Sequence, residues 1–483
     1  MKRIIMKALL IFIMALLSFN IFQDLVKLEI LKPKILGGYY MPAVQDTFTF
    51  AKWFDGTYAE KTGKYLNEQF GIRNFYVRSY NQIRFSLFSK TGATDFIIGR
   101  DNYLYQWGYL NAYDGGDFTG EQSVRDTVAK LKVLESELKA LGKNLLVVIA
   151  PSKVRIYPEF LPDRLRSGGN PKCFYNSYSQ ELKAQGINFI DFNSWFLQKK
   201  DTAKYPLIPK FGMHWSRLEA IKAVDTISSY MGSLSKVKMP AINITEIYES
   251  DSLEMPDWDA LLSLNLLWMP TFKKMHYPKI SITENPSISA LIISDSYWWD
   301  IYVRQIPLKI FKSNEFWYYG RDAYSPYYGK EDALKLDIKR RILQTDCIVI
   351  MCTESNLRLF GYGFITRALN GLKQQLIATP EEISDYTELI KNDTGWMKQI
   401  ETKAIAAKIP VDSMLRLDIN WVLNLRGPIN RGGTVDEMIK KIKNDPVWYG
   451  NVKKQAEQAK ISIDSCLKIN ALYVVNLNKG KKN

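Results

Sequence analysis

Short apolar runs alternate with amphipathic stretches through the middle of the chain. Residues 144–151, 290–293 and 346–351 are rich in Ile, Val and Leu, which is typical of parallel strands buried on both faces of a sheet. Ahead of the first run, apolar residues recur at helical spacing over 124–141, with Ser123 as the expected N-cap. The alternation predicts an α/β fold in which helices cover both faces of a parallel sheet.

The first residues combine positive charge with a long apolar stretch. Lys2 and Arg3 precede the apolar residues 8–22, which is the form of an export signal. Together with the residues just before it, the stretch is long enough to span a bilayer, and no small-residue cleavage site follows. We therefore expect an uncleaved anchor over 1–25 with the rest of the chain on the outer side of the membrane. A cleaved signal peptide and a buried core helix are the alternatives.

The pattern divides the chain into four regions. We expect a signal anchor over 1–25, a helical linker over 26–89, an α/β domain over 90–376 and a helical-hairpin repeat over 377–483. In the last region Ile390-Lys391-Asn392-Asp393 recurs 52 residues later as Ile442-Lys443-Asn444-Asp445. Each copy predicts a helix, a short break and a second helix capped by an Asp-Ser pair.

Composition limits the possible partners and cofactors. The chain is globular in composition, with 46% hydrophobic and 24% charged residues, and its net charge of +15 favours an anionic partner. Nucleic acid is disfavoured because the domain is expected outside the cytoplasm and carries no recognition motif. The four cysteines and two histidines form no CxxC or Cys/His cluster, so we expect no metal site and no cofactor.

A candidate nucleophile follows the apolar run 290–293. Ser294, Asp295 and Ser296 break the run, and the residues after them can begin a helix. A strand-to-helix turn of this kind lifts a serine hydroxyl above the sheet and directs backbone N–H groups toward its substrate. Ser296 is therefore a candidate nucleophile; the alternative is that both serines only cap the helix.

A candidate general base lies in a loop before another helix. Ser216 and Glu219 have capping-box spacing and begin the helix expected over 220–231. His214 stands two residues ahead of Ser216, where an imidazole can reach into a cleft. The alternative is that His214 only packs beside Trp215 at the helix entry.

Polar residues also follow the other expected strands. Ser152-Lys153, Asp191 and Thr353-Glu354-Ser355-Asn356 stand at strand ends, as the Ser294–Ser296 turn does. Ligand sites of parallel sheets form outside the carboxyl ends of the strands. We therefore expect these side chains to share one cleft.

Several of these motifs together resemble a known family. Gly99–Tyr105, Ala150–Lys153 with Tyr157–Glu159, Met213–Ser216 and Ser294–Tyr297 are similar to motifs of the SGNH-hydrolase-like O-acetyltransferases of exopolysaccharide export, the AlgX and AlgJ family. The family places an Asp-x-His-Trp motif before a Gly-x-Ser nucleophile, the reverse of the usual SGNH order. His214 and Ser296 keep that order, so the resemblance implies an SGNH-hydrolase-like, flavodoxin-like sheet with permuted motifs.

Two positions depart from the family pattern. Gly212 stands where the family has its aspartate, and Ser294 stands where it has the glycine of Gly-x-Ser. Loss of the orienting acid of a triad lowers turnover by about 10⁴. Either Glu354 or Asp295 orients His214, or a Ser–His dyad acts alone, or the chain is an inactive relative.

The resemblance implies an acetyl transfer in the periplasm. His214 takes the proton of Ser296, which attacks an acetyl ester or thioester, and a polysaccharide hydroxyl then accepts the acetyl group. A multi-spanning membrane O-acyltransferase is the implied acetyl donor. A secreted carbohydrate esterase and a non-catalytic polysaccharide-binding protein are the alternatives. The remaining candidates for the oxyanion or substrate site are Asn356, Glu354, Asp295, Lys153, Tyr319 and Arg321.

Overall fold

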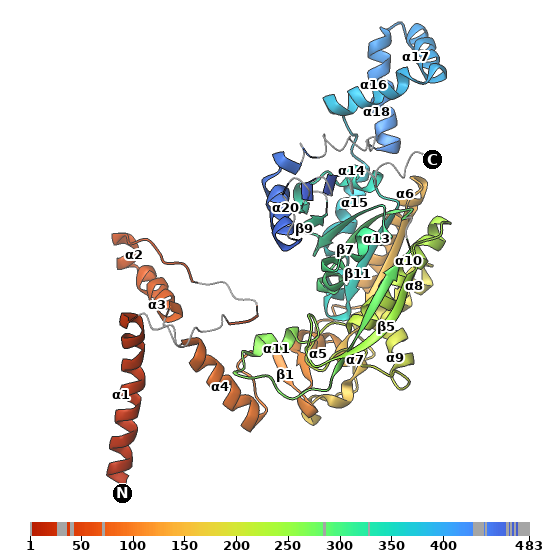
Figure 1. The fold of residues 1–483 in the computed structure, drawn as a ribbon. Helices are drawn as coiled ribbons and strands as arrows, with labels where there is room; N and C mark the ends of the chain where they lie inside the picture. Colours follow the sequence, from red (N-terminus) through yellow and green to blue (C-terminus); the bar gives the residue numbers. More distant parts are fainter. Residues whose placement is uncertain are drawn as a thin grey trace.

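A seven-stranded sheet forms the centre of the computed structural model, which describes residues 2–26, 36–38, 43–69, 73–283, 286–326, 329–427, 439, 442–459, 463, 466–467 and 470–471. The strands lie in the order β10-β9-β8-β7-β11-β3-β4. Figure 1 shows helices on both sides of this sheet. The strands are β3 (Asn144–Ala150), β4 (Phe189–Asp191), β7 (Ser289–Ser294), β8 (Ser313–Tyr318), β9 (Asp322–Ser325), β10 (Gly329–Asp332) and β11 (Cys347–Thr353).

The sheet is mixed, which corrects the expectation of a parallel sheet. Strands β8, β7, β11, β3 and β4 pair in parallel, whereas β9 is antiparallel to β8 and β10 is antiparallel to β9. After β8 the chain turns back at once, because Tyr319 and Gly320 both adopt positive φ, 49° and 65°. Two successive residues of positive φ make the tight turn that matches the twist of a hairpin.

Each apolar strand divides its side chains between two cores. In β7, Ala290 and Ile292 join one core cluster, while Leu291 and Ile293 join the other. Successive side chains point to opposite faces of a strand, so a strand covered on both faces must be apolar throughout. The first face is covered by α5 (Trp107–Tyr113), α7 (Lys153–Ile156), α9 (Phe192–Lys199), α10 (Arg217–Ser235), α11 (Asp259–Leu264), α12 (Trp299–Val303) and α13 (Ile306–Ile310). The second face is covered by α6 (Glu121–Ala140), α8 (Phe174–Ala184), α14 (Ile338–Leu343) and α15 (Phe364–Leu372).

Two small antiparallel pairs flank the main sheet. The hairpin of β1 (Phe96–Ile98) and β2 (Leu104–Gln106) adds its apolar residues to the first core. The pair of β5 (Ile242–Ser250) and β6 (Met275–Ile282) was not expected. The short 3-10 turns are η2 (Arg100–Asn102), η3 (Pro158–Phe160), η4 (Asp163–Leu165), η5 (Ser296–Trp298), η6 (Ala333–Lys335) and η7 (Glu354–Gly363).

The predicted N-cap Ser216 is confirmed at α10, which runs to Ser235 and not to 231, whereas the predicted N-cap of α6 is wrong. Ser216 caps α10 and its side chain accepts the Glu219 N–H, as expected. Helix α6 begins earlier than expected, with Gly120 at the N-cap, so Ser123 lies inside its first turn and donates to the Gly120 carbonyl.

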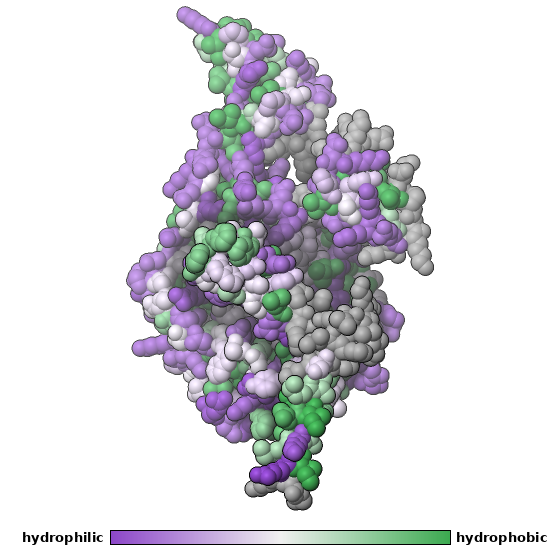
Figure 2. Space-filling view, turned by 90° about the vertical axis from the view of Figure 1, so that its left-hand side faces the viewer, coloured by the Kyte–Doolittle hydropathy of each residue, from purple (hydrophilic) through white to green (hydrophobic). Residues whose placement is uncertain are grey.

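The N-terminal region is helical, in α1 (Lys2–Val26), α2 (Phe50–Phe54), α3 (Thr57–Gln69) and α4 (Arg73–Phe88). Ile4 and Phe12 of α1 are 73% and 60% exposed, and Figure 2 shows hydrophobic residues behind a hydrophilic tip at the bottom of the molecule. Within the described part of the chain, no helix combines the length and the apolar character that crossing a membrane requires. The predicted membrane anchor over 1–25 is therefore not supported.

The C-terminal region contains α16 (Pro380–Lys391), α17 (Thr394–Ala407), α18 (Val411–Arg426) and α20 (Pro446–Ala459). The bounds of α17 and α20 differ by the 52 residues of the sequence repeat at both ends. Helix α18 begins at Val411 with Pro410 at its N-cap, so the expected cap formed by Asp412 and Ser413 is wrong. Most of the second helix predicted for the second copy lies outside the described residues.

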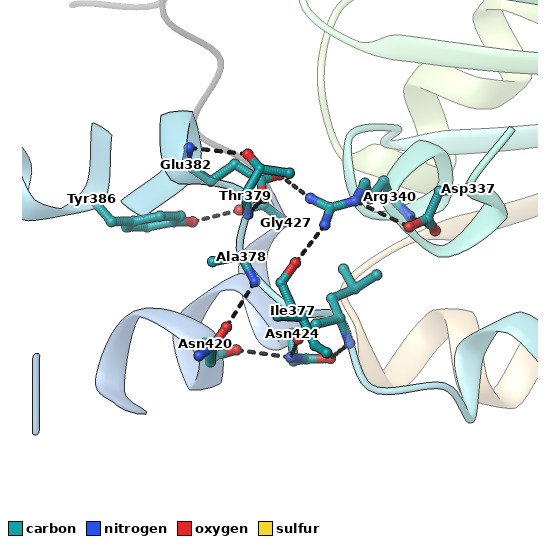
Figure 3. Close-up of polar contacts among 11 residues, drawn as sticks. Asp337, Arg340, Ile377, Ala378, Thr379, Glu382, Tyr386, Asn420, Asn424 and Gly427 are labelled. Carbon is teal, nitrogen blue, oxygen red and sulfur yellow. Dashed lines mark hydrogen bonds and ion pairs between the residues drawn. The ribbon is translucent and has the colours of Figure 1, made fainter. Parts of the chain in front are cut away.

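Polar contacts connect α16 and α18 to the α/β domain (Figure 3). Arg340 of α14 donates to Asp337, to Glu382 of α16 and to the Ile377 carbonyl. Asn424 of α18 accepts the Leu376 N–H at 2.7 Å and donates to the Leu376 carbonyl at 2.8 Å. The connecting segment thus has backbone groups paired with side chains of α14 before it and of α18 after it.

Candidate active site

Ser296 lies in the turn that leaves the carboxyl end of β7. Asp295 caps this turn, since its Oδ1 accepts the Tyr297 N–H at 3.2 Å, and the chain then forms η5 and α12. The Ser296 side chain is half-buried, whereas Asp295 and Tyr297 on either side are fully buried. The strand-to-helix turn expected from the sequence therefore forms and presents the Ser296 hydroxyl at the end of the sheet.

His214 meets Ser296 across 82 residues of sequence. Its Nε2 lies 2.8 Å from Ser296 Oγ, and its ring packs on Tyr297 with 4.7 Å between ring centroids. Tyr297 in turn holds its hydroxyl 2.8 Å from the Met213 carbonyl, next to His214 in the chain. The two candidates from the sequence are thus held together in one place by a buried neighbour of the serine.

Asp259, which the sequence analysis missed, orients the histidine. Its Oδ2 forms a short hydrogen bond with His214 Nδ1, and its Oδ1 accepts the Met213 N–H at 2.8 Å and the Ala260 N–H at 2.7 Å. Because the carboxylate accepts the Nδ1 proton, Nε2 is left unprotonated and accepts from the serine hydroxyl. The Asp257-Trp258-Asp259 pattern at a helix start was the available signal, but nothing in it points to His214.

Gly212 explains how the carboxylate reaches His214 from Asp259. A Cβ at Gly212 would lie 2.7 Å from the Pro256 carbonyl oxygen and 3.1 Å from that of Asp257. The segment that carries Asp259 therefore packs on the backbone of position 212, where the family has its aspartate. Because of these short distances, any side chain at position 212 would force residues 256–259 to take a different path.

Lys153 is not a substrate-binding residue, which corrects that prediction. It is fully buried, and its Nζ donates to the carbonyls of Pro209, Lys210 and Gly212 at 2.7–2.8 Å. An ammonium group has three N–H donors, and all three are used. Burial holds the pKa of Lys153 well below its usual range. The residue anchors the loop that leads into His214.

Glu354 does not orient His214 either. It is 1% exposed and makes two hydrogen bonds with Arg155, one of them at 2.8 Å. The Arg155 guanidinium also lies over the Tyr175 ring, 4.1 Å from its centroid. Burial raises the pKa of Glu354 against the opposing effect of Arg155. This pair connects α7 to η7 and leaves no oxygen directed at the imidazole.

Asp295 and Asn356 hold the turn together. Asp295 Oδ2 accepts hydrogen bonds from the Thr353 N–H and hydroxyl at 2.8 Å, from Asn356 Nδ2 at 2.9 Å and from the Tyr362 hydroxyl at 3.1 Å. The prediction that Asp295 orients the histidine is therefore wrong. Asn356 Nδ2 is also 3.0 Å from Thr353 Oγ1, so its amide hydrogens are engaged and do not serve an oxyanion here.

Tyr319 lies beside the serine, whereas Arg321 lies on the exposed hairpin turn. The Tyr319 hydroxyl interacts with the side chains of Asn356 and Ser296. Burial, followed by the charge of Asp295, raises the pKa of Tyr319, so the phenol keeps its proton and remains a donor. Arg321 is exposed to solvent and the structure does not bring it to Ser296.

Charge around the imidazole sets its protonation. Burial acts to lower the pKa of His214, but the Asp259 carboxylate, with smaller effects of Asp295 and Asp300, raises it above the ordinary value. The site therefore favours the imidazolium that forms when His214 accepts a proton. General-base catalysis works best when the pKa lies near the working pH.

The mixed sheet with helices on both faces is an SGNH-hydrolase-like α/β fold. Residues 96–241 match the SGNH hydrolase-like domain of the acetyltransferase AlgX. The predicted resemblance to the AlgX and AlgJ family is confirmed over this part of the chain.

Relatives of this chain include several AlgJ proteins. A probable alginate O-acetylase AlgJ of Pseudomonas syringae is 22% identical over 243 residues, which are 50% of this chain and 59% of that protein. The Pseudomonas aeruginosa AlgJ is 23% identical over 40% of this chain and 48% of its own length. The chain thus spans about half the length of these relatives.

Two solved structures are also similar to part of this chain. The O-acetyltransferase domain of Pseudomonas putida AlgJ has 16% identity and a TM-score of 0.36, over 57% of this chain and 99% of that domain. Pseudomonas aeruginosa AlgX has 12% identity and a TM-score of 0.38, over 59% of this chain and 69% of AlgX.

Gly212→Ala is predicted to disturb the site without touching a polar group. The added methyl displaces the 256–259 segment and with it Asp259, so we expect a destabilisation of about 1–3 kcal/mol and at least a tenfold loss of any activity that depends on the relay. Thermal unfolding and turnover of the full chain measure the two effects. Gly108→Ala, whose added Cβ meets nothing within 4 Å, is the matched control. Equal activity of Gly212→Ala and native chain would contradict the packing argument.

Asp257 is predicted to make stability fall as pH rises. Burial, with the charge of Asp300, raises its pKa to about 7 from 3.8, against the effects of Tyr277 and Arg217. Between these values the unfolded chain has released a proton that the folded chain retains, so the free energy of unfolding falls by roughly 1.4 kcal/mol per pH unit from this group. Asp257→Asn removes the effect. We expect the Tm of Asp257→Asn, relative to that of the native chain, to increase from pH 5 to pH 7.5. A Tm difference that stays constant over this range would show that Asp257 does not titrate there.

Proposed function

We propose that this chain is an O-acetyltransferase that passes an acetyl group through Ser296 to hydroxyl groups of a polysaccharide. The observation that carries the proposal is the continuous hydrogen-bonded relay from Asp259 through His214 to Ser296. The matched AlgX acetyltransferase domain and the AlgJ relatives support acetyl as the transferred group. The absence of an aspartate at position 212 had left an inactive relative as an alternative. The hydrogen bonds of Asp259, His214 and Ser296 argue against that alternative.

The relay supplies the proton transfers of a two-step acyl exchange. His214 Nε2 takes the Ser296 proton as Oγ attacks the acetyl carbonyl, and the imidazolium then returns a proton to the leaving alcohol or thiol. An acetyl-serine results. A sugar hydroxyl next gives its proton to His214 and attacks the acetyl-serine, which regenerates the Ser296 hydroxyl and releases the O-acetylated sugar.

Two donors stand where negative charge would develop on the acetyl oxygen. The Ser296 N–H lies at the start of η5, directly before the Tyr297 N–H that Asp295 Oδ1 accepts. The Tyr319 hydroxyl, which keeps its proton, lies beside Ser296. Fixed donors of this kind stabilise an oxyanion without reorganisation during the reaction.

The location and the acetyl donor are part of the proposal. The export-signal pattern of residues 2–22 supports action outside the cytoplasm. A multi-spanning membrane O-acyltransferase as acetyl donor is proposed on the family resemblance. The basic net charge of +15 suits an anionic polymer as acceptor.

Ser296→Ala is predicted to abolish transfer. Removal of the nucleophile of a relay lowers turnover by about 10⁶ in a well-studied case, so we expect no transfer above background. The assay gives the full chain a chromogenic acetyl ester with and without an oligosaccharide, and mass spectrometry detects the acetylated sugar.

The control is Ser294→Ala at the end of β7, because Ser294 is fully buried and its Oγ bonds to no residue in the described part of the chain. Its activity should stay within about threefold of the native chain. Free acetate without acetylated sugar would assign a carbohydrate esterase instead. Turnover unchanged in Ser296→Ala would refute both activities.

Asp259→Asn is predicted to shift the pH profile as well as the rate. Activity needs neutral His214, so it falls as pH decreases through the raised pKa of that imidazole. Loss of the carboxylate removes the main effect that raises the pKa of His214, so the acidic limb moves to lower pH. The maximal rate falls by about 10⁴, because the imidazole loses its tautomer and orientation. Profiles of kcat/KM from pH 5 to 9 test this, and an unmoved limb would exclude Asp259 as the partner.

A further inference from the structure

A groove of about 1020 Å³ separates the hairpin edge of the main sheet from the C-terminal helix α20. Figure 1 shows α20 beside β9. The helix is seated closely on the sheet edge, since a Cβ added at Gly329 of β10 would lie 3.3 Å from Val447 of α20. Side chains from α12, α13, β8, β9 and α20 line the groove.

The lining combines rings, amides and lysines. Tyr302, Tyr324 and Trp448 contribute rings, while Asn314, Asn451, Gln455 and Asn470 contribute amides. Lys309, Lys330 and Lys454 also line the groove, and among the described residues that do so none is an aspartate or a glutamate. Lys330 pairs with Asp322 at 3.1 Å, whereas Lys309 and Lys454 pair with no carboxylate that the structure describes.

Asn314 provides an independent sign of a ligand. It is only 2% exposed and lines the groove, and among the residues that the structure describes none accepts a hydrogen bond from its Nδ2. A buried polar group without a partner costs about 1–3 kcal/mol, so an amide left in this state points to a partner that arrives from outside. A hydroxyl or carboxylate oxygen in the groove would accept from it.

The internal repeat shows that these groove residues replace a closed contact. In the first copy, Asp418 accepts from the Trp396 indole N–H at 2.8 Å and from Lys403 at 2.7 Å. The equivalent residues 52 positions later are Trp448, Gln455 and Asn470, and all three line the groove.

The second copy has lost the carboxylate and the cation of the first. Asn470 donates to Gln455 at 3.2 Å, and no residue in the described part of the chain accepts from the Trp448 indole. The first copy thus pairs opposite charges within the unit, whereas the second copy has uncharged side chains at the same positions and leaves the Trp448 indole N–H available to a ligand. Exposed aromatic faces with amide and indole donors are groups that bind sugar rings and their hydroxyls.

A row of rings connects the groove to the proposed nucleophile. Tyr324 in the groove packs on Trp299 at 4.7 Å between centroids, Trp299 on Tyr318 at 5.5 Å, and Tyr318 on Tyr319 at 4.6 Å. Tyr319 lies beside Ser296. The groove and the candidate active site are therefore on the same aromatic edge of the sheet.

We propose that this groove binds a segment of an anionic, carboxylate-bearing polysaccharide and so holds the acceptor chain while another part of it reaches Ser296. The proposal deepens the proposed function and rests on it for the identity of the polymer as acceptor. Rings and amides hold the sugar, Asn314 meets an oxygen of it, and Lys309 and Lys454 attract its carboxylates. The absence of carboxylates from the described lining avoids repulsion of an acidic chain.

Binding to the full chain carrying Ser296→Ala tests the groove apart from catalysis. The probe is a linear mannuronate hexamer, with cellohexaose as the uncharged control, measured by isothermal titration calorimetry at two salt concentrations. We expect the hexamer to bind at least tenfold more tightly than cellohexaose and less tightly at high salt. Trp448→Ala should weaken its binding at least tenfold, and Lys454→Glu, at an exposed position that does not support the fold, at least threefold.

Trp396→Ala in the first repeat copy is the matched control and should bind the hexamer within twofold of the parent. No binding of the hexamer to the parent, equal affinity for both sugars, or unchanged binding in both Trp448→Ala and Lys454→Glu would overturn the proposal. If the hexamer binds the Ser296→Ala variant as expected while the native chain transfers no acetyl group, that result would support the groove as a binding site and refute only the proposed acetyltransferase function.

Discussion

The packing of the 256–259 segment on the bare backbone of Gly212 is the constraint on which the site depends. It places Asp259 against His214 Nδ1 and allows the same carboxylate to accept the Met213 N–H. The orienting acid thus reaches the imidazole from 45 residues further along the chain, although position 212 has none. The geometry that a triad needs is set by where the carboxylate lies, and the chain can supply it from either segment.

The buried Lys153 supports the position of His214 through the 209–212 loop. Lys153 donates to three carbonyls of the 209–212 loop. A buried carbonyl without a donor is costly, and Lys153 supplies a donor to the buried Pro209 and Gly212 carbonyls. The same loop carries Gly212 toward the 256–259 segment and continues into His214. Loss of the ammonium would leave the Pro209 and Gly212 carbonyls without that donor, while the Lys210 carbonyl would keep the Leu104 N–H at 3.0 Å. Lys153 therefore helps to set the position of His214 without contacting a substrate.

The sequence predicted the elements that depend on local pattern and missed those that depend on distant contacts. The run at β7 was recognised as a strand because burial on both faces requires apolar residues throughout, and Ser296 and His214 stood out by residue type and position. Asp259 could not be found, because it reaches His214 only after the 256–259 segment packs on Gly212. Lys153 was misread since a polar residue at a strand end gives no sign of whether it points into the cleft or into the protein. The antiparallel return from β8 into β9 was missed because Tyr319, not a glycine, begins its turn with positive φ.

The two repeat copies show how one helical unit can be stabilised in two ways. In the first, Asp418 neutralises Lys403 and satisfies Trp396, so the contact is complete within the unit. In the second, the unit has exchanged that ion pair for Asn470 and Gln455 and retains its small apolar core around Val452 and Leu467. An ion pair at a partly buried position contributes little net stability once its desolvation is counted, so its loss is tolerable. The two copies therefore differ in their surfaces. The first has a charged contact that is closed within the unit, and the second has Trp448, Gln455 and Asn470 lining the groove beside the sheet edge.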